Sequence, residues 1–418
     1  MLPKIHKLGN PGRPIVSACS CPTENISSLL HTIFMPIVEN LPTFFKDTTH
    51  ALNILEHFEP ENPEDFRLFT MDITALYTSI PNNDALIALK HFLDKRPNPY
   101  IKTDIILRLA ELVLTLNTFQ FNGNFYSQTG GVAMGTKMGP SFACLFVGYL
   151  EERMFSEYIG PVPDLYKRYI DDVFGVSSDS PQELQLFIDF VSSYHPAIKY
   201  TFNITQEKLS FLDIECRILD NRITTSVFYK PTDAHCYLNY ASCHPEACKN
   251  AIPKSQFLRL RRICNNDSDF KQQSEKMKTF FVNRGYPIRV LDRALSSVSQ
   301  IDRTSALEPK KQKLSDRVPL VLTYHPHNIA IRNILINNFH SIVLEDQHMA
   351  AVFDTPPVMA FRKGKSLRQH LVTSSLRNTA CRQPANYFGT KKCERPMCST
   401  CPFTWVTDEV RGPVNTFT

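Results

Sequence analysis

The segment Tyr169-Ile-Asp-Asp172 constrains the fold of this chain most, because two adjacent acids interrupt a run of apolar and aromatic residues. The flanking side chains are Tyr166, Tyr169, Val173, Phe174 and Val176. This pattern predicts two short strands joined by a tight turn, with Asp171-Asp172 at the tip. Two carboxylates on a buried hairpin repel each other and lose hydration unless a cation such as Mg²⁺ neutralises them. The alternative is an acidic turn that faces water, and these four residues alone do not decide between the two.

The composition is ordinary for a folded protein of two or three domains, but the positive charge is unevenly placed. Of the 418 residues, 43% are hydrophobic and 21% are charged, and the formal net charge is +5. Residues 249–313 hold 15 Lys and Arg against 6 Asp and Glu, and residues 362–395 hold 9 against 1. Such segments favour phosphate backbones as partners, and the alternative is solvated helix faces. No apolar run has the length of a membrane-spanning helix and the N-terminus lacks a signal-peptide core, so we expect an intracellular protein without a membrane partner.

Apolar periodicity predicts strands and helices that interleave up to about residue 231, which is typical of an α+β protein. The predicted helices cover residues 23–38, 81–95, 103–116, 140–157 and 180–195. The predicted strands cover residues 66–72, 200–205, 209–219 and 222–229, with a hairpin at 119–126 and turns at Asn122-Gly123 and Asp220-Asn221. Beyond residue 235 the chain is mostly helical and basic to about residue 346, and the C-terminal remainder is basic and poorly periodic.

Asp72 is a further acid that the pattern singles out, because it ends an apolar strand 99 residues before Asp171. One acid from a strand and two from a facing hairpin can hold two divalent ions about 4 Å apart, the arrangement used for in-line phosphoryl or nucleotidyl transfer. One ion would lower the pKa of an attacking hydroxyl, and the other would stabilise a leaving pyrophosphate. Catalysis would then consist mostly of positioning and charge neutralisation.

Two further features suit a nucleotide site. A ring at Tyr77 would lie under the incoming sugar and clash with a 2′-hydroxyl, and the alternative is a core tyrosine on a strand-to-helix turn. The glycine-rich loop Gly135-Thr-Lys-Met-Gly139 lets the backbone approach a base pair or sugar closely. This loop lacks the Walker spacing, which argues against a nucleotide-hydrolysing P-loop.

Taken in order, these motifs resemble those of the reverse transcriptases, and more closely those of Penelope-like retroelements. The resemblance covers nearly the whole chain. Its main motifs are Leu2-Pro-Lys-Ile-His-Lys7, Gly12-Arg-Pro-Ile-Val-Ser17, Asp72-Ile-Thr-Ala-Leu-Tyr77-Thr-Ser-Ile-Pro81, Ala133-Met-Gly-Thr-Lys-Met-Gly-Pro140 and Tyr169-Ile-Asp-Asp172. Later segments match as well: Phe211-Leu-Asp213, Tyr229-Lys-Pro-Thr232, Arg284-Gly-Tyr-Pro287, Pro356-Pro357, Phe361-Arg-Lys and the terminal cysteine cluster.

The resemblance implies a right-hand polymerase of fingers, palm and thumb, with a ferredoxin-like palm, a helical thumb and a basic, Cys-containing C-terminal extension. The implied domains are 1–47 as N-terminally incomplete fingers, 48–235 as palm with inserted fingers helices, 236–350 as helical thumb, and 351–418 as basic linker with the Cys cluster. Because the chain starts in a fingers motif and contains no GIY-YIG endonuclease motif, we expect a fragment of a longer element protein. Target cleavage is therefore not assigned to it.

The same resemblance implies roles for particular residues. The catalytic residues, which would also hold two Mg²⁺ ions, are Asp72, Asp171 and Asp172. The nucleotide would be bound at its triphosphate by Lys4 and Arg13, at its sugar by Tyr77, and at its base by Met134 and Gly135. Primer and template, recognised by backbone and duplex shape more than by sequence, would be contacted by Lys230, Arg259, Arg261 and Arg262. Asp213 would be structural.

Twelve cysteines in an intracellular chain point to free thiols or metal ligands. Cys393, Cys398 and Cys401 are clustered and resemble the knuckle that precedes the endonuclease in these elements. Three thiolates are one ligand short of a tetrahedral Zn²⁺ site, and Cys381 is the candidate for the fourth. The alternative is reduced thiols without a metal, and the spacing does not decide between them.

The sequence thus predicts an RNA-directed DNA polymerase, a nucleotidyltransferase of a retrotransposon that uses an RNA template, a DNA primer and dNTPs. The resemblance implies a nuclear location, and no oligomeric state is predicted. One alternative is a catalytically inactive nucleic-acid-binding remnant of such an element. Another is an intron-maturase-like RNA-binding protein, although the C-terminal segment does not resemble a maturase domain.

Overall fold

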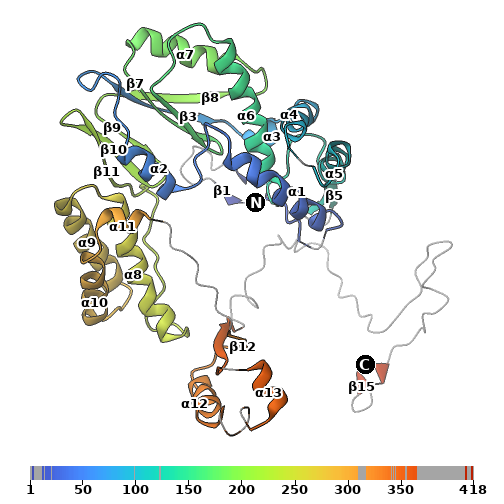
Figure 1. Ribbon diagram of the computed structural model, residues 1–418, viewed down its shortest axis with the longest axis vertical. Helices are drawn as coiled ribbons and strands as arrows, with labels where there is room; N and C mark the ends of the chain where they lie inside the picture. Colours follow the sequence, from blue (N-terminus) through green and yellow to red (C-terminus); the bar gives the residue numbers. More distant parts are fainter. Residues whose placement is uncertain are drawn as a thin grey trace, which may run out of the picture. The chain divides into compact units, whose positions relative to one another are not determined.

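The computed structural model describes residues 2–3, 12–13, 15–19, 21–97, 99–121, 124–308, 317–339, 341, 343, 345–353, 355–364, 410–411 and 416–417 (Figure 1). The chain divides into two compact units, Met1–Gly364 and Lys365–Thr418. In the first unit helices and strands interleave, which confirms the α+β class predicted from the sequence. Among the described residues, no helix combines the length and the apolar composition needed to cross a membrane.

A four-stranded antiparallel sheet organises the first unit, in the order β6-β7-β3-β8 (Figure 1). Its strands are β3 (Arg67–Ile73), β6 (Leu165–Tyr169), β7 (Asp172–Ser177) and β8 (Tyr200–Thr205). Several helices lie in the connection from β3 to β6, and helix α7 (Pro181–Ser193) links β7 to β8. The strand predicted at residues 66–72 and the predicted hairpin are confirmed, but the tip of the hairpin is Ile170-Asp171 and not Asp171-Asp172, because Asp172 is the first residue of β7 and pairs with Tyr169.

Strand β3 is buried along most of its length because apolar side chains occupy it almost continuously. The buried residues are Leu68, Phe69, Met71 and Ile73. Phe69 lies directly opposite Gly175 of β7, where an added Cβ atom would stand 2.1 Å from the Phe69 ring. Glycine at this position leaves room for the ring. This close packing fixes the register of β3 against β7.

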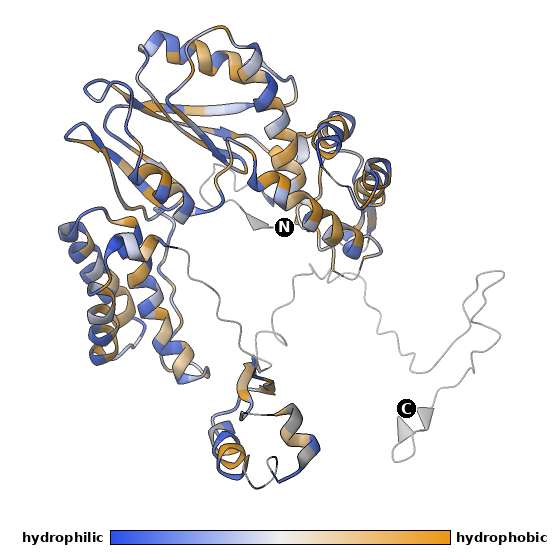
Figure 2. Ribbon diagram, in the orientation of Figure 1, coloured by the Kyte–Doolittle hydropathy of each residue, from blue (hydrophilic) through white to orange (hydrophobic). Residues whose placement is uncertain are grey.

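The helices packed on this part of the unit are α1 (Glu24–Glu39), α2 (Thr48–Glu56), α3 (Leu76–Ser79), α4 (Asn82–Asp94), α5 (Thr103–Thr115) and α6 (Gly139–Glu157). Helix α6 is apolar on almost all sides (Figure 2), and it shares one buried cluster with α1, α4 and α5. The predictions for α1, α4, α5 and α6 are confirmed to within one residue at each end. Helix α2 was not predicted.

A second, three-stranded sheet follows β8 in the order β11-β10-β9. Its strands are β9 (Lys208–Phe211), β10 (Ile214–Leu219) and β11 (Arg222–Val227). The single strand predicted at residues 209–219 is wrong, because Leu212 has a positive φ of 54° and forms a two-residue turn with Asp213. The turn predicted at Asp220-Asn221 is confirmed, and both residues have positive φ, which is typical of a type I′ hairpin.

Beyond the second sheet, a group of helices packs together: α8 (Glu246–Ile263), α9 (Asp267–Val282), α10 (Ile288–Ser299) and α11 (Arg303–Leu307). Their apolar side chains join those of the second sheet in one buried cluster, in which Phe257 and Phe281 are fully buried. The hydroxyl of Thr225 in β11 donates a hydrogen bond of 2.6 Å to the Ile263 carbonyl, which ties α8 to the sheet. Gly285, with a φ of +79°, lies in the turn between α9 and α10.

The other described residues form small sheets and two helices. Strands β12 (Pro319–Thr323) and β13 (Val358–Arg362) pair in parallel, with α12 (Asn328–Phe339) and α13 (Gln347–Val352) between them in sequence. Antiparallel pairs are formed by β1 (Leu2–Pro3) with β2 (Gly12–Arg13), β4 (Thr118–Phe121) with β5 (Asn124–Ser127), and β14 (Val410–Arg411) with β15 (Thr416–Phe417). The β4–β5 pair confirms the predicted hairpin, whose turn residues Asn122-Gly123 lie outside the described residues. The division at residues 47, 235 and 350 remains a prediction.

Candidate active site

Asp72 and Asp172 face each other in the central sheet. They are direct partners in the register of β3 and β7, a position in which Cβ atoms stand about 5 Å apart. The preceding pair, Met71 with Val173, is buried and holds the two strands together at this point. Like charges placed directly opposite destabilise a sheet, so the fold tolerates a repulsion here.

Asp171 lies at the tip of the hairpin between β6 and β7. Tyr169 pairs with Asp172, which leaves Ile170 and Asp171 as a two-residue turn. Ile170 has a φ of 57°, a conformation that a β-branched residue rarely adopts. The Asp171 carbonyl accepts a hydrogen bond of 2.9 Å from the amide of Ile73, which fastens the tip to the end of β3. The structure therefore brings both hairpin acids to the end of the strand that carries the third.

Burial and the two other acids act on the charge of Asp172. The pKa of Asp172 is raised from 3.8 to about 6, first by burial and then by the negative charges of Asp171 and Asp72. The ammonium group of Lys230 acts in the opposite direction and lowers that pKa. Asp171, Asp72 and Lys230 therefore lie close enough to Asp172 to act on its charge.

Open space borders the acids. Asp72 and Asp172 line a cleft of about 200 Å³ together with residues of β8 and β9. Lys230 and Arg259 line a second cleft of about 350 Å³, and Leu212 borders both clefts. Asp72 and Asp172 therefore face a space that a ligand can reach.

The acids match a divalent ion in chemical type and in charge. Hard ions such as Mg²⁺ bind carboxylate oxygens and waters. Burial first, and then the charges of Asp171 and Asp72, raise the pKa of Asp172, and a cation bound there would lower it again. In the described part of the chain, however, no three acidic, His or Cys side chains are already grouped as metal ligands. Binding would therefore require the carboxylates of Asp72, Asp171 and Asp172 to draw together around the ion.

Tyr77 lies on the single turn of α3, just beyond the end of β3. Burial raises its pKa above the usual range, and the nearby Cys144 and Asp171 raise it further. The ring is also partly buried against the apolar cluster around α6. Tyr77 thus lies near the acids and packs on the core at the same time. Its role at the sugar of a nucleotide remains a prediction.

Residues 132–135, which lead into and begin the glycine-rich loop, contact both the Tyr77 turn and the N-terminal segment. Val132 donates a hydrogen bond of 2.6 Å to the Tyr77 carbonyl, and Val16 donates one of 2.9 Å to the Met134 carbonyl. A Cβ atom at Gly135, whose φ is +138°, would stand 1.9 Å from the Val16 carbonyl oxygen. The close approach that requires glycine here is thus made by the chain's own backbone. That Met134 and Gly135 line a nucleotide site remains a prediction.

Several predicted ligands lie outside the described residues. Lys4 is one of them, whereas Arg13 is described as an exposed residue of β2. The predicted zinc ligands also lie outside: Cys381, Cys393, Cys398 and Cys401. For Lys4 and the four cysteines, the predicted roles therefore stay predictions.

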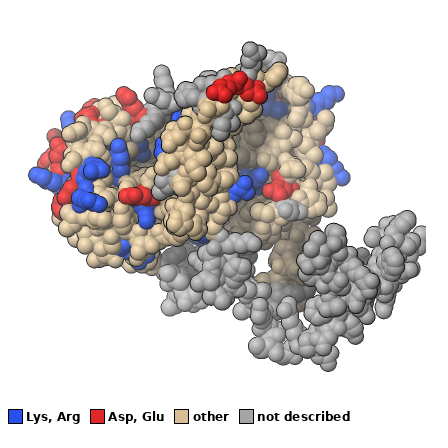
Figure 3. All heavy atoms as spheres, turned by 90° about the horizontal axis from the view of Figure 1, so that it is seen from below, with Lys and Arg blue, Asp and Glu red and all other residues tan. Residues whose placement is uncertain are grey.

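The arginines predicted to contact primer and template make contacts within the fold. Arg259 forms an ion pair with Asp213, with Nη2 and Oδ2 2.7 Å apart. Arg261 and Arg262 donate hydrogen bonds of 2.9 and 2.7 Å to backbone carbonyls near α11. On the face drawn in Figure 3, Lys and Arg side chains alternate with Asp and Glu over the region of α9 and α10. Contacts of these three arginines to nucleic acid remain a prediction.

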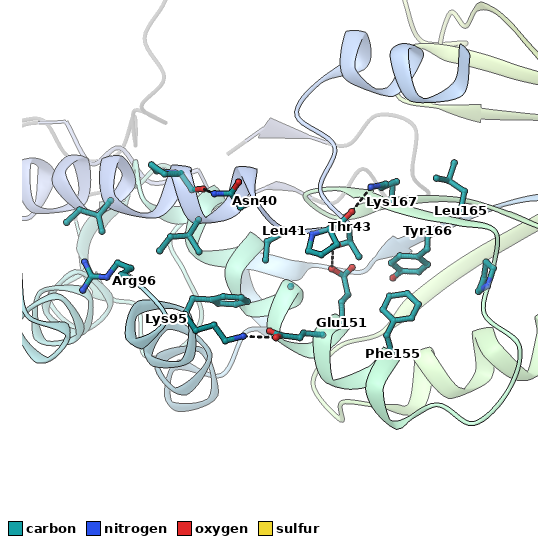
Figure 4. A pocket seen from close by; sticks show the side chains of 18 of the residues that line it. Asn40, Leu41, Thr43, Lys95, Arg96, Glu151, Phe155, Leu165, Tyr166 and Lys167 are labelled. Carbon is teal, nitrogen blue, oxygen red and sulfur yellow. Dashed lines mark hydrogen bonds and ion pairs between the residues drawn. The ribbon is translucent and has the colours of Figure 1, made fainter. Parts of the chain in front are cut away.

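Sequence reasoning did not find a buried ion pair next to the hairpin turn. Arg168 of β6, which has no exposed surface, donates two hydrogen bonds to Glu151 of α6. Thr43 also donates a hydrogen bond to Glu151, at the wall of a cavity of about 960 Å³ (Figure 4). The one available signal was a charged residue among aromatic residues of a predicted strand, since such a side chain needs a buried partner if it points inward.

Comparison with known proteins gives one family match and no match among curated proteins. The family described as "Animal helix-turn-helix domain" matches residues 236–296, which contain α8, α9 and most of α10. This match covers a small part of the chain and therefore does not assign the whole chain to a family.

Solved structures of polymerases are similar to the chain at low identity. The telomerase from Candida albicans, in complex with a TWJ fragment of telomeric RNA, is 12% identical with a TM-score of 0.44, over 80% of this chain and 52% of that chain. The apo telomerase from Candida tropicalis is 10% identical with a TM-score of 0.42, over 66% and 52% of the two chains. The RNA-dependent RNA polymerase of a human picobirnavirus is 11% identical with a TM-score of 0.41, over 62% and 49%. The chain thus spans about half the length of these structures.

Proposed function

We propose that this chain is an RNA-directed DNA polymerase, which transfers a nucleotide from a dNTP to the 3′-hydroxyl of a primer and releases pyrophosphate. The observation that carries the proposal is the meeting of Asp72, Asp171 and Asp172 at one end of the central sheet. Acids that repel one another beside an open cleft would provide, once drawn together around an ion, the cation site that nucleotidyl transfer requires.

The topology of the central sheet supports the same proposal. Strands and helices follow the order β-α-β-β-α-β, with β3 and β7 in the middle of the sheet, which is a ferredoxin-like arrangement. The motif resemblance implies such a sheet for the palm of a right-hand polymerase. In this interpretation α8–α11 form the thumb.

Each site residue has a separate task in this proposal. Mg²⁺ bound by the three acids would neutralise the triphosphate and activate the primer hydroxyl. Asp72 would bind from the rigid strand β3, and Asp171 and Asp172 would bind from the facing hairpin. The ammonium group of Lys230, which already acts on Asp172, would attract the primer backbone. Around the nucleotide, the triphosphate would contact Lys4 and Arg13, the sugar Tyr77, and the base Met134 and Gly135.

Extension of oligo(dT) on a poly(rA) template in the presence of Mg²⁺ tests the proposal. The wild-type chain should extend the primer, whereas Asp72→Ala and Asp171→Ala should abolish extension and leave duplex binding largely intact. Glu207→Gln removes an exposed acid between β8 and β9, and it should extend like the wild type. Wild-type extension by either aspartate variant would rule the assignment out.

The sugar role of Tyr77 has its own test. Tyr77→Val should raise incorporation of ribonucleotides, because the ring no longer excludes a 2′-hydroxyl, whereas Tyr77→Phe keeps the ring and should not. Competition between rNTPs and dNTPs in primer extension measures this ratio. An unchanged ratio in Tyr77→Val would leave Tyr77 as a core residue.

The motif resemblance supports three finer proposals: origin in a Penelope-like retrotransposon, a nuclear location, and a Zn²⁺ site at the C-terminal cysteines. Imaging of the tagged protein in cells tests the location, and the zinc content of the purified chain tests the metal. A protein outside the nucleus, or a chain without zinc, would remove the corresponding proposal and leave the polymerase proposal standing.

A second candidate function is nucleic-acid binding without catalysis, which the helix-turn-helix match to residues 236–296 favours. Helices α9 and α10 are joined by a short turn through Gly285, and α10 exposes Arg289 and Arg293 one turn apart. In this case Arg289→Gln with Arg293→Gln should weaken duplex binding and reduce its salt dependence. Primer extension would then be absent in the wild type.

A further inference from the structure

The ion pair of Arg168 with Glu151 has no task in the scheme above, although it is the most deeply buried pair among the described residues. The relative exposure is 0% for Arg168 and 2% for Glu151. The contact is bidentate, with Nε to Oε1 at 2.6 Å and Nη2 to Oε2 at 2.8 Å. Removing two charges from water is so unfavourable that apolar side chains of similar volume often stabilise a fold as well or better. Stability alone therefore does not explain this pair.

The third nitrogen of the Arg168 guanidinium reaches the hairpin turn. Nη1 donates a hydrogen bond of 2.9 Å to the carbonyl of Ile170, whose carbon forms the peptide bond to Asp171. Ile170 has a φ of 57°, and such a conformation persists in a β-branched residue where the surroundings enforce it. Arg168 thus fixes the peptide plane that precedes Asp171.

The next peptide plane is fixed as well, because the Asp171 carbonyl accepts the hydrogen bond of 2.9 Å from Ile73. On its other side, the pair is anchored to a separate segment. Glu151 accepts a hydrogen bond of 2.6 Å from the Thr43 hydroxyl, a contact visible in Figure 4. The Thr43 carbonyl in turn accepts one of 2.6 Å from the Arg168 amide. The turn is therefore held by α6 and the segment before α2 on one side and by β3 on the other.

We propose that Arg168 and Glu151 are positioning residues for the two hairpin acids. The proposal rests on the proposed function, since the acids held in place are those assigned to divalent ions and catalysis. Three guanidinium nitrogens of Arg168 donate hydrogen bonds to both Glu151 carboxylate oxygens and to the carbonyls of Ile170 and Cys144. A lysine ammonium group cannot reproduce this planar fork. The pair touches no substrate, and it acts by fixing the direction in which Asp171 leaves the turn.

Two variants separate positioning from simple packing. The double variant Arg168→Met/Glu151→Leu replaces the pair by apolar side chains and should preserve folding. Arg168→Lys keeps the positive charge but lacks the planar guanidinium group. It replaces the double variant in these measurements if the double variant fails to fold. The matched control is Arg67→Lys, at the opposite end of β3 from Asp72, because the Arg67 side chain is also largely buried and donates to a backbone carbonyl. Urea denaturation identifies the variants that fold like the wild type.

Mn²⁺ affinity and amide hydrogen exchange are the main readouts. In folded variants of the pair, Mn²⁺ affinity measured by electron paramagnetic resonance should fall about 10- to 100-fold, as expected for residues that orient metal ligands. The kcat of primer extension should fall with it, while KM for the template–primer stays unchanged. Without metal, exchange at the amides of Asp171 and Asp172 should become faster in these variants. Arg67→Lys should change none of these values.

The outcomes distinguish this proposal from the proposed function. A folded double variant with wild-type Mn²⁺ affinity, kcat and exchange would overturn the positioning role and leave the polymerase assignment intact. A wild-type chain that neither binds Mn²⁺ nor extends a primer would overturn the proposed function. In that case hydrogen exchange at the Asp171 amide still tests whether the pair holds the turn. If the folded variants of the pair exchange this amide at the wild-type rate, the positioning role is overturned as well.

Discussion

Replacing Asp172 by asparagine should make the metal-free protein more stable at neutral pH. Asparagine keeps the shape of the side chain and removes a charge that the fold holds beside Asp171 and Asp72. The pKa of Asp172 rises from 3.8 to about 6 on folding, so the folded state binds more protons than the unfolded state between these values. The stability linked to this group is fully present below pH 3.8 and is lost as the pH rises through about 6. At neutral pH the wild type has lost this stability because Asp172 is ionised, whereas the asparagine of the variant stays neutral and keeps it.

The size of the gain follows from the pKa of Asp172. A shift of about two pKa units corresponds to about 3 kcal/mol in the free energy of unfolding. Because Asp172 is only partly buried, solvent screening lowers this to roughly half, about 1.5 kcal/mol. At about pH 4.5 the folded protein already carries a proton on Asp172, and the gain should shrink to about 0.5 kcal/mol.

Urea denaturation followed by circular dichroism, with a chelator present, measures the gain at about pH 7.5 and about pH 4.5. Glu207→Gln is the matched control, because it neutralises an exposed acid and should change the free energy of unfolding by less than about 0.5 kcal/mol. If Asp172→Asn is no more stable than the wild type, or gains equally at both pH values, burial and the neighbouring acids do not hold the pKa of Asp172 above its usual value.

Two further predictions concern the supports of the site. Gly135→Ala should lower the free energy of unfolding by at least about 2 kcal/mol, because its Cβ would meet the Val16 carbonyl oxygen at 1.9 Å. Gly130→Ala, with no atom within 4 Å of its Cβ, should change it by less than about 0.5 kcal/mol, and equal losses in urea denaturation would contradict the geometry. A double-mutant cycle of Arg259→Gln with Asp213→Asn should give a coupling free energy of about 0.5–1 kcal/mol that decreases with salt, since the pair is partly exposed. Zero coupling would show that the pair does not tie α8 to the second sheet.

Much of the fold could be predicted from the sequence, because the signals are local. The start of α7 is one example: Ser180 and Glu183 form the reciprocal hydrogen bonds of a capping box. The strand predicted at residues 209–219 failed because leucine is not a turn-forming residue. The positive φ of Leu212 accompanies the antiparallel pairing of β9 with β10, which the residue pattern does not reveal.

The acids of the candidate site could be predicted, but not the contacts that support them. The order of motifs pointed to Asp72, Asp171 and Asp172. The contact of Gly135 with Val16 joins segments far apart in the chain, so it left no local signal. The pair of Arg168 with Glu151 joins a strand to a helix, and neither periodicity nor composition shows which buried charges meet.

A crystal structure with Mn²⁺ is the most direct test of whether Asp72, Asp171 and Asp172 share one divalent-ion site. Anomalous difference density should appear between the Asp72 carboxylate and those of the hairpin, with carboxylate oxygens about 2.1 Å from the ion. The density should disappear in Asp72→Asn. Saturating Mn²⁺ without density at this place, or an Asp72 carboxylate on the opposite face of the sheet from Asp172, would contradict the shared site.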